Sequence, residues 1–174
     1  MLITMVGDST AFASLIFGYF FFWTVRSDFP PADAGPGMLL PLLAAASALL
    51  GWLALTAAKR WNQRHQRPRA QLAMAAAALA AIAAAVLLIM TPRLAGMDPT
   101  MHSYPATVWV LCGWAAAHLA VGSVMASYVL ARALTGRLTA NHDAELHNVM
   151  LYWHFLILTV VATAAVVGGV PRLV

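Results

Sequence analysis

Residues 148–170 read NVMLYWHFLILTVVATAAVVGGV, and this stretch decides the fold class. It contains no aspartate, glutamate, lysine or arginine. At roughly 1.5 Å per residue, it is long enough to cross ~30 Å of hydrocarbon as a helix. Inside a bilayer no water satisfies the backbone N–H and C=O groups, so a spanning segment of this kind must be helical. The stretch therefore predicts a membrane-spanning helix that carries one titratable group, His154.

Four similar apolar runs precede it, at 2–25, 38–58, 71–91 and 105–131. Hydrophobic residues make up 62% of the chain and charged residues only 9%, with a mean hydropathy of +0.78. These values lie outside the range of soluble domains. We therefore predict an all-α polytopic membrane protein, with one transmembrane domain of five helices over residues 1–174. The first run carries Asp8 and follows no basic segment, so we expect a retained helix rather than a cleaved signal.

The basic residues predict the orientation of these helices. Cytoplasmic loops of membrane proteins carry an excess of lysine and arginine. Seven of the ten lysines and arginines fall after the second run or after the fourth: Lys59, Arg60, Arg64, Arg67, Arg69, Arg132 and Arg137. The pattern predicts a cytoplasmic amino terminus and a periplasmic carboxyl terminus. Because topology accounts for the net charge of +4, we expect no nucleic-acid partner.

The prolines and small residues favour a scaffold over a transporter. Secondary transporters build midplane sites from broken helices, whereas all nine prolines fall in predicted loops or at helix ends. Pairs of small residues four positions apart allow close packing of helices in lipid. These pairs are Ser14 with Gly18, Gly113 with Ala117, and Gly122 with Ala126.

Three polar groups inside the apolar runs are candidate functional residues: Asp8, His118 and His154. Ionisable groups at this depth are costly and are often functional. One interpretation makes Asp8 a hydrogen-bonded structural carboxyl, and the other makes it a proton-conducting or lipid-organising group. For His118 and His154 we expect hydrogen bonds between helices, because imidazole can donate at one nitrogen and accept at the other.

Ligands for a metal or cofactor are few in this sequence. Cys112 is the only cysteine, which excludes a disulfide or a covalently attached haem. His147 and His154 lie two helical turns apart, too far to ligate one ion. The remaining histidines, His65, His102 and His142, fall in predicted loops, where we expect them to be solvated. The sequence thus predicts no catalytic, metal-binding or cofactor-binding residue in this chain.

Several motifs, in order along the chain, resemble subunit III of the haem-copper terminal oxidases, the cytochrome c oxidase subunit III family. The family's last helix carries a Tyr-Trp-His-Phe motif, matched by Tyr152, Trp153, His154 and Phe155. Other family motifs are matched at six further places in this chain. These are Gly7-Asp8, the aromatic run from Phe12 to Trp23, Phe29-Pro30-Pro31, Gly113 with His118 and Gly122, Arg132, and Thr139 to His142. The sequence departs from the family pattern at Asp8, Ala115, His147 and Ile157, where the family has Glu, His, Glu and Asp. It also lacks the two amino-terminal helices of the seven-helix members.

The resemblance implies an accessory subunit without redox centres in a bacterial inner membrane. Such subunits pack beside catalytic subunit I, which holds the haem and copper, and contact other respiratory subunits. They bind structural phospholipid in a cleft between helix groups and support proton uptake and stable turnover. On this basis we expect a lipid-open cleft beside the first helix. Because an arginine at a helix end can bind phosphate, we expect lipid phosphate near Arg132. The alternative is that Arg132 serves only as a positively charged anchor on the cytoplasmic side.

Two other interpretations of the sequence remain. The chain could be a subunit III-like partner of a quinol oxidase or a nitric oxide reductase, with similar helices and a different complex. It could instead be a small haem b membrane protein, with His118 and His154 as axial ligands, or a small transporter.

Overall fold

The computed structural model describes residues 2–31, 35–140 and 143–172. Within these ranges the chain forms five long helices: α1 (Leu2–Val25), α2 (Leu39–Gln63), α3 (Arg67–Leu94), α4 (Ser103–Leu134) and α5 (Ala144–Ala164). A π-helical turn (Ala165–Gly169) and a 3₁₀ turn (Val170–Arg172) continue α5. All five helices are long and apolar enough to cross a membrane. The structure therefore confirms the predicted helical class and the five spans of a multi-pass membrane protein.

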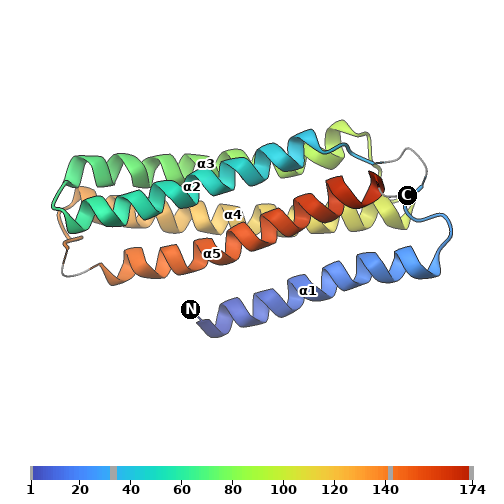
Figure 1. The fold of residues 1–174 in the computed structure, drawn as a ribbon, viewed down its shortest axis with the longest axis horizontal. Helices are drawn as coiled ribbons and strands as arrows, with labels where there is room; N and C mark the ends of the chain where they lie inside the picture. Colours follow the sequence, from blue (N-terminus) through green and yellow to red (C-terminus); the bar gives the residue numbers. More distant parts are fainter. Residues whose placement is uncertain (1, 32–34, 141–142, 173–174) are drawn as a thin grey trace.

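Helices α2 to α5 form a bundle, and α1 lies along one side of it (Figure 1). Small residues bring α2 and α3 close together, because helices in lipid associate by packing rather than by the hydrophobic effect. More than half of the buried residues of α3 are alanines, with Ala70, Ala73, Ala77, Ala81 and Ala84 at spacings of three or four. Two serines link the helices further. Ser47 Oγ donates to the Ala80 carbonyl at 3.0 Å, and Ser123 Oγ to the Ala78 carbonyl at 3.1 Å.

The helices extend beyond most of the boundaries that the apolar runs predicted. The predicted 38–58 is observed as Leu39–Gln63, 71–91 as Arg67–Leu94, and 105–131 as Ser103–Leu134. Hydropathy marks the edge of the apolar layer, whereas arginine and lysine are good helix formers whose long stems reach past that edge. The loop predicted at 59–70 therefore shrinks to residues 64–66, and Pro68 lies in the first turn of α3, where proline is tolerated.

The last helix differs from its predicted range of 148–170 at both ends. It begins at Ala144, with Glu145 in a first turn that favours negative charge. Its α-helical part ends at Ala164, and the π-helical turn follows. Gly168 in that turn sits against the start of α2, where a Cβ atom would lie 3.2 Å from Met38 Cα. A side chain at this position would displace backbone, so glycine permits the close approach.

Helix α1 is the least buried of the five spans. It packs mainly against α4 and, over a shorter stretch, against α5. Its best-packed part is an aromatic cluster at the carboxyl end, where the Tyr19 and Phe29 ring centroids lie 5.1 Å apart and those of Phe29 and Tyr104 5.3 Å. Toward its amino end, Phe12 is the buried apolar side chain. The polar groups of α1 therefore contribute much of what positions that end.

Candidate functional site

The motif residues Tyr152, Trp153 and His154 lie where α5 packs against both α2 and α4. Tyr152 Oη donates to the His118 carbonyl of α4 at 3.3 Å. His154 Nε2 accepts from Trp52 Nε1 of α2, also at 3.3 Å, and the two rings meet edge to face. Trp153 is fully buried between these contacts. The motif therefore joins three helices.

Two glycines leave room for bulky side chains of α5 where the three helices meet. A Cβ atom on Gly51 of α2 would collide with the six-membered ring of Trp153, and one on Gly122 of α4 would collide with Leu156 Cδ1. Sequence reasoning identified Gly122 but missed Gly51. The available signal was the position of Gly51, near the middle of an apolar run and next to a tryptophan.

Trp52 lies near the middle of α2, which extends from Leu39 to Gln63. An indole N–H in hydrocarbon needs an acceptor, and His154 of α5 supplies one. His154 Nδ1 lies 2.7 Å from the Met150 carbonyl, which can only accept, so Nδ1 carries the proton. Both nitrogens of His154 are thus engaged, and the ring is a neutral link between helices.

His118 lies at the middle of α4 and faces Asp8 of α1. Its Nδ1 lies 2.8 Å from the Trp114 carbonyl, and its Nε2 lies 3.6 Å from Asp8 Oδ2. The His118 side chain is 14% exposed and that of Asp8 30%. These two predicted site residues are therefore brought together, whereas His154 faces α2. Phe155 packs edge-on against the His118 ring and completes the surroundings from α5.

Arg132, the residue predicted to bind lipid phosphate, pairs with Glu145 across the loop between α4 and α5. Its Nη2 lies 3.0 Å from Glu145 Oε1. Arg132 Nε is buried and makes no hydrogen bond with any of the described residues. Asn141 and His142, which extend the matched motif after Arg132, lie outside the residues that the structure describes.

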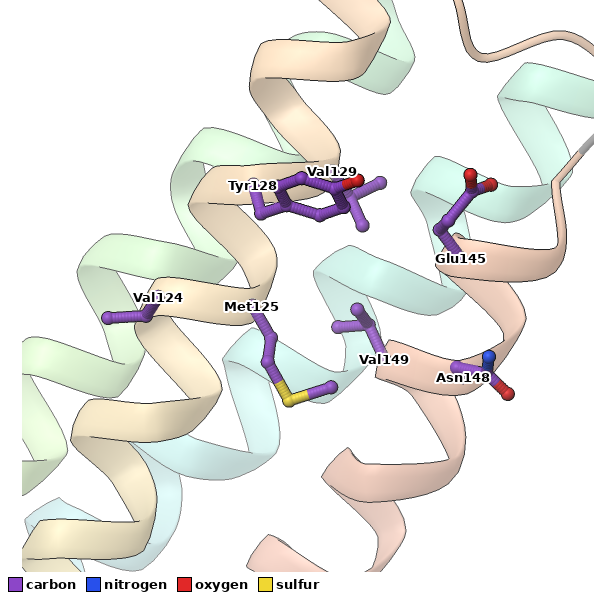
Figure 2. A pocket seen from close by; sticks show the side chains of 7 residues that line it. All are labelled: Val124, Met125, Tyr128, Val129, Glu145, Asn148 and Val149. Carbon is purple, nitrogen blue, oxygen red and sulfur yellow. The ribbon is translucent and has the colours of Figure 1, made fainter. Parts of the chain in front are cut away.

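A hollow of about 410 Å³ opens between α4 and α5 beside this ion pair. Val124, Met125, Val129 and Val149 give it apolar walls, and Tyr128, Glu145 and Asn148 add polar groups. Met125 and Tyr128 reach from α4 toward α5 (Figure 2). The arrangement combines an apolar groove with one charged lining group, the Glu145 carboxylate that pairs with Arg132, and this suits an amphiphilic molecule.

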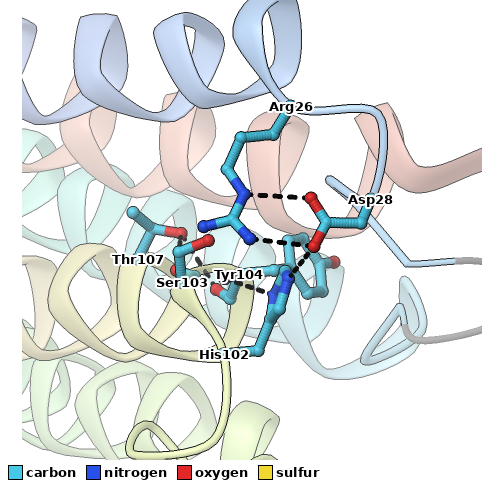
Figure 3. A network of polar contacts seen from close by, with 6 residues as sticks. All are labelled: Arg26, Asp28, His102, Ser103, Tyr104 and Thr107. Carbon is cyan, nitrogen blue, oxygen red and sulfur yellow. Dashed lines mark hydrogen bonds and ion pairs between the residues drawn. The ribbon is translucent and has the colours of Figure 1, made fainter.

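His102 corrects the prediction that it would be solvated. Its Nδ1 accepts from the Tyr104 backbone N–H at 3.1 Å and so caps the start of α4. Its Nε2 lies 2.9 Å from Asp28 Oδ2, and Arg26 holds the same carboxylate through two bonds of 2.9 Å (Figure 3). The Arg26 guanidinium, and after it His102, hold the pKa of Asp28 well below its usual range. This network fastens the carboxyl end of α1 to the amino end of α4.

A second hollow, of about 340 Å³, lies between α1 and α4. Small side chains line much of it, among them Ser14 and Gly18 of α1 and Ala106 of α4. The hollow is bounded by the same two helices whose ends the Asp28–His102 contact connects.

At the opposite end of the bundle, polar contacts tie α2 and α3 to α4, to α5 and to the loop between them. Lys59 Nζ lies 3.2 Å from His147 Nδ1, and Asn62 donates to the Thr139 carbonyl at 3.2 Å. Gln71 of α3 donates to the Ala133 carbonyl at 3.1 Å. His65 is exposed in the 64–66 turn, as expected for a solvated residue.

Comparison with known proteins adds no identification. No protein-family model matches this sequence, and no curated protein matches it.

Proposed function

We propose that this chain is a non-redox accessory subunit of the subunit III type, part of a haem-copper terminal oxidase in a bacterial inner membrane. In this proposal it packs on catalytic subunit I, which carries the haem and copper and reduces oxygen. The chain binds structural phospholipid and supports proton uptake and stable turnover. Its amino terminus is cytoplasmic, because the basic ends of α2 and α3, together with Arg132 and Arg137, then face the cytoplasm.

One observation supports this proposal most: residues of the Tyr-Trp-His-Phe motif, which carries part of the family resemblance, join the helices. Tyr152, Trp153 and His154 connect α5 to α2 and α4 through two hydrogen bonds and a buried ring. A haem iron would need a free imidazole nitrogen, but His154 Nε2 already accepts from Trp52 and His118 Nε2 faces Asp8. The engaged imidazoles favour a packing role over axial ligation, and therefore a scaffold over a small haem b protein.

Lipid binding is proposed at the groove between α4 and α5. The apolar walls around Met125 suit an acyl chain. At its charged end, the Arg132 guanidinium supplies N–H groups for a phosphate, and Glu145 supplies an acceptor. A headgroup that carries both a phosphate and an ammonium matches this pair better than a purely anionic one, because it satisfies both charges.

Affinity purification of the tagged chain from its native membranes tests the proposal. In mild detergent we expect a haem-copper catalytic subunit to copurify in stoichiometric amount, together with its haem absorption. Copurification with the catalytic subunit of a nitric oxide reductase instead would reassign the complex. Recovery of the chain alone with a stoichiometric Soret band would contradict the scaffold proposal and show that this chain itself binds haem.

A further inference from the structure

The two intramembrane histidines differ in one respect that the packing role does not explain. In both, Nδ1–H donates to a carbonyl one turn earlier, Trp114 for His118 and Met150 for His154. The Nε2 atom of each ring is then left as an acceptor. His154 uses it to accept from an indole that cannot lose its proton under ordinary conditions. His118 turns its Nε2 toward the Asp8 carboxyl group, which can hold or release a proton.

Because the partner of His118 is a carboxyl group, the Asp8–His118 pair can hold no proton, one or two between the carboxyl group and Nε2. With one proton between the two groups, the pair is either a carboxylic acid facing a neutral imidazole or a carboxylate facing an imidazolium, and both forms carry no net charge. With no proton, an unpaired carboxylate faces the imidazole lone pair. With two, an imidazolium and a carboxylic acid face each other and carry a net positive charge. Net charge at this depth is costly, so the pair favours a single shared proton.

We propose that Asp8 and His118 form an intramembrane proton-binding site, and that their shared proton holds the amino-terminal half of α1 against α4. The third titratable group nearby is Tyr152 of α5, and its hydroxyl is engaged with the His118 carbonyl. Arg132 and Glu145 lie more than three helical turns further along α4 and at the start of α5, where they pair with each other. The inference does not depend on the oxidase proposal.

Few other contacts hold the amino-terminal half of α1, so its position should depend on the Asp8–His118 pair. The described residues of α1 and of the segment after it have two close carboxylate–imidazole contacts with α4: Asp8 with His118 near the amino end, and Asp28 with His102 near the other. The second contact is reinforced by Arg26 and lies beside the aromatic cluster. The first has Phe12 as the buried apolar residue nearby and the hollow around Gly18 beyond it. Losing or adding a proton at Asp8 and His118 should therefore loosen the amino-terminal half of α1 and leave the other end in place.

Pulsed electron paramagnetic resonance in lipid nanodiscs tests this inference. Spin labels on Ile3→Cys of α1 and Val124→Cys of α4 occupy exposed positions, in a background where buried Cys112 is replaced by alanine. We expect a narrow distance distribution while the pair holds one proton, and a broader and longer one when the pH is moved far enough to empty or doubly fill the site. The same titration on Asp8→Asn should give a narrow, pH-independent distribution, because the amide donates to His118 Nε2 without titrating.

Two further variants make the outcome decisive. Asp8→Ala should give a broad distance distribution at every pH, because no polar side chain at position 8 then faces His118. Asp28→Asn, the matched change at the other contact, should keep the wild-type pH response between residues 3 and 124. A wild-type distribution that does not change with pH would overturn the inference. A wild-type pH response retained in Asp8→Asn would overturn it as well.

Discussion

At the scale of single residues, Trp153 and the glycine facing it set how closely α2 and α5 can approach. The tryptophan ring is fully buried, and the space beside it exists because Gly51 has no side chain. Such fits are sensitive to one added methyl group, because interiors pack at crystal-like density and a buried ring has no room to move.

Gly51→Ala should therefore destabilise the protein by ~1–3 kcal/mol, the usual cost of overpacking. Gly122→Ala should cost less, because it meets the end of the flexible Leu156 side chain. Gly113→Ala is the matched control: beyond its own helical turns, none of the described residues comes within 4 Å of the added carbon, and alanine is the better helix former by ~0.5–1 kcal/mol. Thermal unfolding in detergent measures all three. Equal stability of the Gly51 and Gly113 variants would contradict the tight fit of Trp153 against Gly51.

At the scale of helices, the connection between α1 and α4 should depend on acid at its Asp28 end. The folded protein holds the pKa of Asp28 below its usual value of ~3.9, so the ion pair stabilises the fold at neutral pH. That contribution is lost as the pH falls below about 4 and through the lowered pKa. Because Asp28 is exposed, solvent screens the effect and the contribution should be small.

Asp28→Asn should accordingly lower the unfolding midpoint at neutral pH, and the gap to wild type should narrow on acidification. Asp98→Asn is the control, because the pKa of Asp98 is also lowered but by the hydroxyl and backbone of Thr100, within one turn. Removing the Asp98 carboxylate leaves the α1–α4 connection intact and should give the smaller shift in the unfolding midpoint at pH 7. A difference in unfolding midpoint between wild type and Asp28→Asn that grows in acid would contradict a stabilising role of the Asp28 carboxylate at neutral pH.

Substitutions at the ends of α4 and α5 test the lipid proposal. Arg132→Ala should release a phospholipid that copurifies with wild type, because the guanidinium is the phosphate donor. Arg137→Ala, an exposed arginine beyond the end of α4, should retain it. Glu145→Gln should shift the bound population toward anionic headgroups, since it removes the acceptor for an ammonium. Mass spectrometry of the extracted lipids reports all three, and an unchanged lipid complement in Arg132→Ala would reduce Arg132 to a structural ion pair.

The elements also show what the sequence could and could not predict. Continuous apolar runs identified all five helices, because the bilayer leaves the backbone no alternative. Their ends were missed, since residues such as Arg67 and Glu145 are polar yet helical. His118, His154 and Asp8 stood out as polar groups in hydrocarbon. The contacts between distant residues did not: Trp52 with His154 and Asp28 with His102 join residues 102 and 74 positions apart, and only packing brings them together.

At the scale of the whole molecule, the proposed orientation in the membrane rests on the excess of basic residues at one end of the bundle. Single cysteines at Arg64 and Asp98 lie in exposed turns at opposite ends of α3, and the native Cys112 is buried. A membrane-impermeant thiol reagent applied from the periplasmic side should label Asp98→Cys and leave Arg64→Cys unlabelled until the membrane is opened. Labelling of both from one side would contradict the proposed topology.

The central claim is that the matched histidine joins helices in an accessory subunit while a partner carries the haem. The most direct measurement is the ratio of this chain to haem in the complex purified through its catalytic subunit, for wild type and for His154→Ala. Leu158→Ala, a change at an exposed position of the same helix, serves as control. We predict that His154→Ala lowers the amount of this chain per haem and leaves the haem spectrum of the catalytic subunit unchanged. A loss of haem in proportion to the mutated chain would contradict the account and make His154 a ligand.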